Sequence, residues 1–100
     1  MRLAIMAIAL PFSCPVWATE FPVVGGHGFD WLNPDHTQCR RVTEADAKKF
    51  KACEFLADGN AFGLQSPYHS CRVSKRSEYF VYGSRAKCVE AFETMRSNAP

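Results

Sequence analysis

Four of the five cysteines, Cys39, Cys53, Cys71 and Cys88, constrain the fold of this 100-residue chain more than any other feature; the fifth, Cys14, lies in an N-terminal segment that we expect to be removed. An even number of cysteines in a short exported chain is typical of a disulfide framework, and so small a domain is marginal on apolar burial alone. Ligands of a structural zinc site usually stand two to four residues apart, whereas the gaps here hold 13, 17 and 16 residues. We therefore predict two disulfides rather than a zinc site.

The N-terminus carries the features of an export signal. Met1-Arg2 supplies a positive charge, residues 3–10 are uninterruptedly apolar, and Val16 and Ala18 occupy the −3 and −1 positions that a signal peptidase reads. The apolar run is about half of the roughly 20 residues that a membrane span needs. We predict that residues 1–18 are a signal peptide cleaved after Ala18, rather than a membrane anchor.

Cys14 offers a second processing route, in which a lipidated cysteine would tether the product to a membrane. Ser13 is small enough for lipoprotein processing, but Pro11 replaces the aliphatic residue expected three positions before the cysteine. We therefore favour an untethered periplasmic or secreted product. The short signal favours a bacterial host over eukaryotic secretion.

Cleavage leaves 82 residues, enough for one small domain. They carry 11 basic and 10 acidic residues, a net charge of +1. A balance so close to zero implies neither nucleic acid nor an anionic membrane as a partner.

Residues 19–38 are rich in glycine, proline and aromatic side chains and show no regular periodicity. We predict an irregular arm, in which the run Gly25-Gly26-His27-Gly28 is a flexible joint. Phe29 and Trp31 add too much apolar surface for a solvated linker, so part of the arm is expected to pack against the domain that residues 39–100 form.

Two helices are predicted within that domain. The first spans residues 43–58, with Thr43 as N-cap, acidic residues in the first turn and Gly59 after its end. Its cysteine and apolar residues recur at helical spacing, with lysines mostly outside that face. The second helix spans residues 85–96 after the Gly83-Ser84 break, with Cys88 on its apolar side.

A hairpin of residues 69–73 and 78–82 is predicted between the helices. A symmetric turn at Ser74–Ser77 would place one set of side chains on the core face and the other on the solvent face. The predicted core set is His69, Cys71, Val73, Phe80 and Tyr82, and the predicted solvent set is Ser70, Arg72, Tyr79 and Val81.

The predicted fold is therefore α+β: a small two-disulfide domain of α-β-β-α order, with two helices packed on one face of a β-hairpin, preceded by an irregular arm. Three disulfide pairings are possible. A Cys39–Cys53 bridge is awkward, because Cys53 would lie about 15 Å along the helix from its cap. We favour Cys53–Cys71 with Cys39–Cys88.

The arm also gathers possible metal ligands, since imidazole and carboxylate groups bind zinc or copper. These groups stand among glycines and a proline, with no helical spacing to arrange them, so a polar loop with scattered titratable groups is the simpler interpretation. The candidate ligands are His27, Asp30, Asp35 and His36. His69 near Cys71 suggests an activated thiolate, but a cysteine in a disulfide has no thiolate to offer.

A basic and aromatic surface is predicted on the hairpin, where the stretch 72–87 has a net charge of +4. Arginine and large aromatic residues are enriched at interfaces. The simpler interpretation is a solvated strand edge, because cations commonly protect exposed strands. The candidate binding residues are Arg72, Lys75, Arg76 and Tyr79, with Trp31 from the arm.

No nucleophile elbow, phosphate loop, metalloprotease helix or Cys-x-x-Cys motif occurs in the sequence. We therefore predict a non-enzymatic binding module without a cofactor, such as an inhibitor or an envelope-assembly accessory protein. Its partner would be another protein or an anionic envelope component, with no nucleic acid involved. A metal-handling protein built on the arm is the alternative, and a small hydrolase using His36 or His69 is a third hypothesis.

Overall fold

The structure is a computed structural model that describes residues 19–98. The predicted signal peptide and the alternative lipid site at Cys14 lie outside the described residues.

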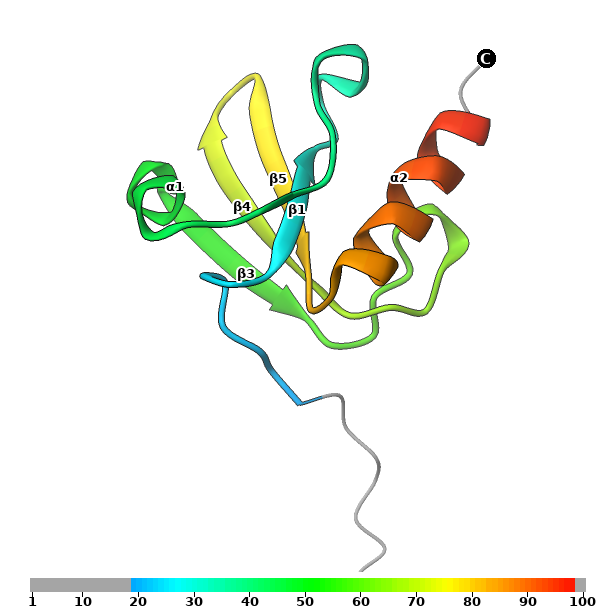
Figure 1. The fold of residues 1–100 in the computed structure, drawn as a ribbon, viewed down its shortest axis with the longest axis horizontal. Coiled ribbons are helices and arrows are strands. Elements are labelled where there is room, and N and C mark those ends of the chain that lie inside the picture. The colour runs from blue at the N-terminus through cyan, green and yellow to red at the C-terminus, as the bar shows by residue number, and fades with distance from the viewer. Residues whose placement is uncertain (1–18, 99–100) are drawn as a thin grey trace, which may run out of the picture.

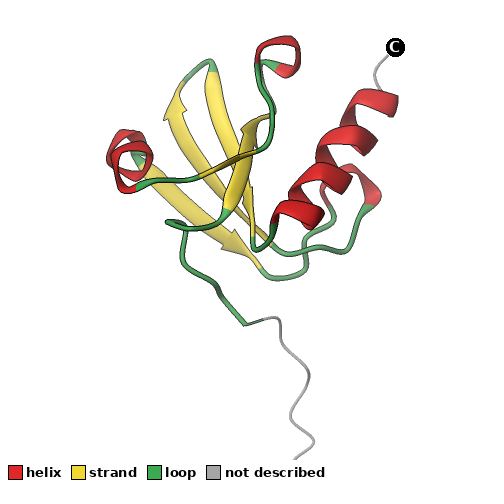
Figure 2. Cartoon of the chain, in the orientation of Figure 1, coloured by secondary structure: helices red, strands yellow, loops and turns green. Residues whose placement is uncertain are grey.

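The described chain is a small α+β domain with a five-stranded antiparallel sheet and one main, C-terminal helix (Figures 1 and 2). The strands stand in the order β2-β1-β5-β4-β3. In chain order the elements are β1 (His27–Asp30), the 3-10 turn η1 (Pro34–His36), β2 (Arg40–Arg41), α1 (Glu44–Lys49), β3 (Ala52–Leu56), the 3-10 turn η2 (Ala61–Gly63), β4 (Tyr68–Ser74), β5 (Ser77–Tyr82) and α2 (Arg85–Asn98).

One face of the sheet, here called the helix face, packs against α2. Its core is built from aromatic rings of three strands together with small side chains of the helix. The Phe29 and Tyr82 rings are stacked, and Phe92 of α2 meets Phe29 edge-on. The buried members are Phe29, Tyr68, Phe80, Tyr82, Cys88 and Ala91.

The opposite face has a smaller core of Val42, Cys71 and Val81. Phe50, directly after α1, and Val23, from the segment before β1, pack against this core. Both faces of the sheet are therefore buried at their centres, which a single hairpin with both helices on one side would not achieve.

Both favoured disulfides are confirmed. Cys39 and Cys88 join the segment before β2 to α2, with Cα atoms 6.1 Å apart. Cys53 and Cys71 are direct cross-strand partners on β3 and β4, with Cα atoms 4.1 Å apart. Two disulfides are consistent with an oxidising environment outside the cytoplasm.

The predicted helix over residues 43–58 is wrong beyond its second turn. Thr43 caps α1 through a reciprocal capping box with Asp46, as the sequence indicated. The helix stops at Lys49 because Phe50 adopts an extended conformation, and residues 52–56 pair with β4 instead. The two-helices-on-one-face arrangement is therefore also wrong, since Phe50 and its neighbours serve the opposite face.

The predicted irregular arm is wrong for residues 27–30, which form β1 between β2 and β5. Gly28 is not part of a flexible joint. A side chain there would bring its Cβ within 2.9 Å of the Phe80 carbonyl oxygen, so glycine permits close approach of the two strands.

The predicted hairpin exists, but its register differs by one residue. The ladder is irregular between Arg72 and Ser74, and Ser74 pairs directly with Ser77. A shift of one residue moves side chains to the other face. His69 and Cys71 therefore share a face with Tyr79 and Val81, while Tyr68, Ser70 and Arg72 share the helix face with Phe80 and Tyr82.

Candidate functional site

The buried carboxylate of Asp30 is fully occupied by protein hydrogen bonds. It accepts from the Ser77 hydroxyl at 2.7 Å, the Asn33 amide at 2.8 Å and the backbone N–H groups of Leu32 and Glu78. Asp30 thus ties the loop after β1 to the start of β5. Its role in the structure is to hold this loop, and few lone pairs are left for a metal.

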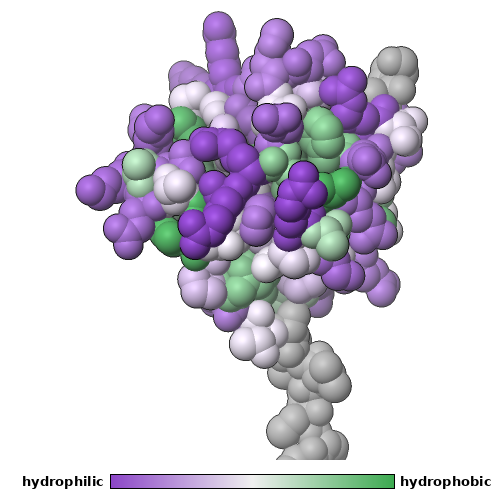
Figure 3. Space-filling model, viewed as in Figure 1, coloured by the Kyte–Doolittle hydropathy of each residue, from purple (hydrophilic) through white to green (hydrophobic). Residues whose placement is uncertain are grey.

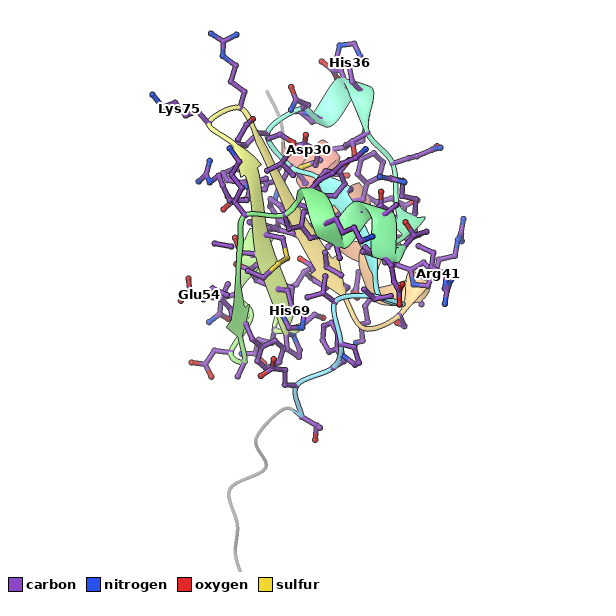
Figure 4. All side chains as sticks on the ribbon, turned by 90° about the vertical axis from the view of Figure 1, so that its left-hand side faces the viewer. Asp30, His36, Arg41, Glu54, His69 and Lys75 are labelled. Carbon is purple, nitrogen blue, oxygen red and sulfur yellow. A yellow bond between two sulfur atoms is a disulfide. The ribbon has the colours of Figure 1, made fainter. Side chains whose placement is uncertain are left out.

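The other candidate metal ligands lie apart from Asp30. His27 faces Tyr82 on the helix face, whereas Asp30 pairs with Tyr79 on the opposite face. Asp35 and His36 are exposed on η1, beyond the end of the strand (Figure 4). Within residues 19–98, no group of three or more His, Cys, Asp or Glu side chains is arranged to hold a metal ion.

His69 has a structural environment rather than a catalytic one. It is 3% exposed, packs against the rings of Phe21 and Phe55, and its Nε2 atom hydrogen-bonds to the Phe21 carbonyl. Its neighbour Cys71 is disulfide-bonded. His69 therefore anchors the N-terminal segment to the sheet and has no thiolate to activate.

A shallow polar hollow of about 390 Å³ lies between the 35–38 segment, Arg40 and Tyr79. Arg40 forms an ion pair with Asp46 at 2.6 Å and lies over the Tyr79 ring. The hydrogen bond from the Thr43 backbone N–H lowers the pKa of Asp46 most, and the hydrogen bond from Arg40 lowers it further. Asp46 in turn raises the pKa of Arg40. Because Asp46 balances its only arginine, the hollow offers little net attraction to an anion.

The candidate binding residues divide between the two faces of the sheet. Arg72 pairs with Glu78 on the helix face, whereas Tyr79 lies on the opposite face beside Phe50. The expected shared solvent face of Arg72 and Tyr79 is therefore wrong. Lys75 and Arg76 form the exposed turn between β4 and β5.

Trp31 lies beside this turn. Its ring stacks on Phe80 and its Nε1 atom donates to Glu78 Oε1 at 2.8 Å. The other oxygen of Glu78 accepts from Ser70 and faces Arg72 at 3.4 Å. The Asn33 amide donates to the Arg76 carbonyl, so the Trp31 loop is fixed against the hairpin turn.

Three lysines lie where α1 leads into the edge strand β3: Lys48 and Lys49 end the helix, and Lys51 follows it at this end of the sheet. Because α1 stops at Lys49, β3 starts beside the end of β4, and the Lys51 N–H donates to the Arg72 carbonyl. The run of lysines at 48–51 was visible in the sequence, but its position depends on where the helix ends. We call the resulting group the basic end; it comprises Lys48, Lys49, Lys51, Arg72, Lys75 and Arg76.

All six side chains of the basic end are exposed, and they are six of the eleven cations in the described chain. Among residues 19–98, Glu78 is the one acid that forms an ion pair with any of them. Glu44 and Glu54 flank the group, one turn back on α1 and two residues along β3. In Figure 4, Lys75 projects from the hairpin turn, and Glu54 lies further toward the other end of the sheet.

The molecular surface seen in Figure 3 is mostly hydrophilic, with small separate apolar patches. Among residues 19–98, no helix has both the length and the apolar character needed to cross a bilayer. Comparison with known proteins gives no match to a family model, a curated protein or a solved structure.

Proposed function

We propose that this protein is an exported, non-enzymatic binding module that recognises an anionic partner through the basic end. The observation that carries the proposal is that six exposed cations lie on neighbouring segments: the end of α1, the residue before β3, the end of β4 and the β4–β5 turn. Such a concentration favours association with a surface of opposite charge and speeds the encounter.

The scaffold beneath the basic end supports this role. Arg72 lies one residue from the Cys53–Cys71 disulfide, and Trp31 and Asn33 hold the hairpin turn from the other side. A rigid support lowers the entropy that the surface loses on binding. Trp31, which shares Glu78 with Arg72, also matches, together with the arginines, the residue types that dominate binding energy at interfaces.

The biological setting that fits is the periplasm or the medium, with an inhibitor or an envelope-assembly accessory protein as the type of activity. For the metal-handling alternative, the separation of His27, Asp30 and His36 provides no arrangement of ligands. The charged end of the sheet therefore remains the better-supported contact surface.

Capture of a partner from envelope extract or culture fluid tests the proposal. The immobilised exported protein is compared with two double variants that change the net charge equally. Lys75→Glu/Arg76→Glu alters the basic end and is expected to lose the specific partner. Arg85→Glu/Lys87→Glu alters the start of α2, at the other end of β5, and is expected to retain it.

Three results would count against the proposal: recovery of neither a specific protein nor anionic lipid, equal capture by both double variants, or loss only in the α2 variant. Intact mass before and after reduction, together with circular dichroism, verifies that each variant has kept both disulfides and its fold.

A further inference from the structure

We infer that the partner of the basic end is the surface of an anionic phospholipid bilayer, with Trp31 at the lipid–water interface. This inference rests on the proposed function and names the partner of the same surface. The net charge of +1 gave no reason to expect a membrane, because the count hides how the charges are distributed.

The first argument is the segregation of charge. The basic end holds six exposed cations, flanked by Glu44 and Glu54. The two acids that border the hairpin turn are held in protein contacts: buried Asp30 accepts from Ser77 and Asn33, and Glu78 is held by Trp31, Ser70 and Arg72. A molecule polarised in this way is attracted to an anionic surface in one orientation, even with a net charge near zero. The attraction acts over about 10 Å at 0.1 M salt.

The second argument is shape. Lys75 and Arg76 occupy a turn that projects beyond the sheet, and Lys75 points away from the domain (Figure 4). A projecting group of flexible lysines contacts several headgroups of a flat surface at once. A discrete phosphate, by contrast, is usually held within converging backbone and side-chain donors.

The third argument is the position of Trp31. The tryptophan is partly exposed, its indole N–H is satisfied by Glu78, and its loop is hydrogen-bonded to Arg76. Tryptophan is favoured at the boundary between headgroups and acyl chains, where one side of the ring is apolar and the other is wet. Lysine and arginine beside a tryptophan therefore suit peripheral contact with anionic lipid.

Trp31 also provides the measurement. The chain has two tryptophans, and cleavage after Ala18 removes the other, Trp17. The emission of the exported protein then reports Trp31 alone. The experiment titrates this protein with vesicles of equal phosphatidylglycerol and phosphatidylcholine, and with vesicles of phosphatidylcholine only, while sedimentation measures the bound fraction.

We expect binding to the anionic vesicles to be at least about tenfold tighter than to the neutral ones, with a blue shift of Trp31 emission. Raising the salt concentration from about 0.1 M to 1 M shortens the screening length from about 10 Å to 3 Å and should release the protein. Lys75→Glu/Arg76→Glu should lose vesicle binding, and Arg85→Glu/Lys87→Glu should keep it.

The outcomes separate this inference from the proposed function. Capture of an acidic protein without vesicle binding overturns the membrane inference and leaves the proposed function intact. Equal loss of vesicle binding in both double variants also overturns the membrane inference, because it means that binding depends on net charge and not on the basic end. Competition by inorganic phosphate at constant ionic strength overturns it too, because it indicates a discrete phosphate site. Failure of both vesicle binding and partner capture contradicts both proposals.

Discussion

The two faces of the sheet are closed in different ways. The helix face is filled by stacked aromatic rings beneath the 14 residues of α2. The opposite face has a core of two valines and a cysteine, with a short helix, the N-terminal segment and polar contacts around it. Each face also has its own disulfide, Cys39–Cys88 on the first and Cys53–Cys71 on the second.

This difference indicates that the two disulfides have different functions in the fold. Cys39–Cys88 holds one layer against another, because it joins the segment before β2 to α2. Cys53–Cys71 holds the edge strand β3 in register with β4, with Cys53 two residues after Lys51 of the basic end. A small chain that buries both faces of a sheet thus fixes its layers and its edge separately.

Removing each disulfide is the largest test of this comparison. The bridges span 49 and 18 residues, and each contains one fully buried cysteine. The packing lost on removal is therefore similar, and loop length should determine which removal lowers the free energy of unfolding more. We expect Cys39→Ala/Cys88→Ala to lower the free energy of unfolding by about 4 kcal/mol and Cys53→Ala/Cys71→Ala by about 3 kcal/mol. Urea unfolding measures both, and the reverse order would show that loop length does not set the relative contribution of the two bridges.

The second test asks whether the opposite face is a true core. Val81 is fully buried there between Val42 and Cys71, whereas Val24 is 38% exposed. Val81→Ala should cost about 2 kcal/mol through lost burial and an unfilled cavity. Val24→Ala, the matched control, should cost less than about 0.5 kcal/mol. Equal small costs would mean that this face is loosely packed.

The third test concerns the polar contacts that border the opposite face. Asp46 accepts from the Thr43 N–H at 2.8 Å and pairs with Arg40, so its pKa is lowered from the usual 3.8. Asp46→Ala should cost about 1 kcal/mol, as loss of a helix cap usually does. Glu44→Ala, an exposed change in the same first turn, should cost much less.

The pH profile checks the same contact. Because the folded-state pKa of Asp46 lies below its unfolded value, the stabilisation is present above about pH 4 and is lost as the pH falls through the folded pKa. The stability difference between the protein and Asp46→Ala should therefore shrink in acid. A constant difference would assign the effect of the substitution to packing instead of charge.

Local signals in the sequence correctly located several elements. The Thr43 cap, the helix after Gly83-Ser84 and the two strands of the hairpin each depend on neighbours within a few residues. The disulfide pairing was also predicted, although for Cys53 the argument assumed a helix. In the structure the pair is explained instead by direct opposition across two strands.

Long-range pairing explains the errors. Residues 52–56 have helical spacing of apolar side chains, but pairing with β4 overrides it. β1 contains two of the residues least typical of strands, Gly28 and Asp30, and forms because β2 and β5 pair with both its edges. Arg72, Lys75 and Arg76 of the basic end were predicted as a basic surface, but its three lysines were missed for the same reason, since the place of Lys51 depends on the start of β3.

The smallest test returns to the helix face, where the hydroxyl of Tyr82 is fully buried and has no hydrogen-bond partner among residues 19–98. Removing an unpaired buried hydroxyl while keeping the ring avoids its desolvation cost, so Tyr82→Phe should raise the free energy of unfolding by up to about 1 kcal/mol. Tyr79→Phe, on the partly exposed opposite face, should give no such gain.

Alkaline pH should enlarge the gain from Tyr82→Phe. Burial, with a smaller effect of Tyr68, raises the pKa of Tyr82 well above the usual 10.0, so the unfolded chain loses this proton first. The folded protein with Tyr82 therefore loses stability as the pH rises above about 10, and the phenylalanine variant does not lose that part. Urea unfolding at pH 7 and pH 11 measures the difference. A gain that stays constant would mean that the Tyr82 hydroxyl reaches solvent in the folded protein.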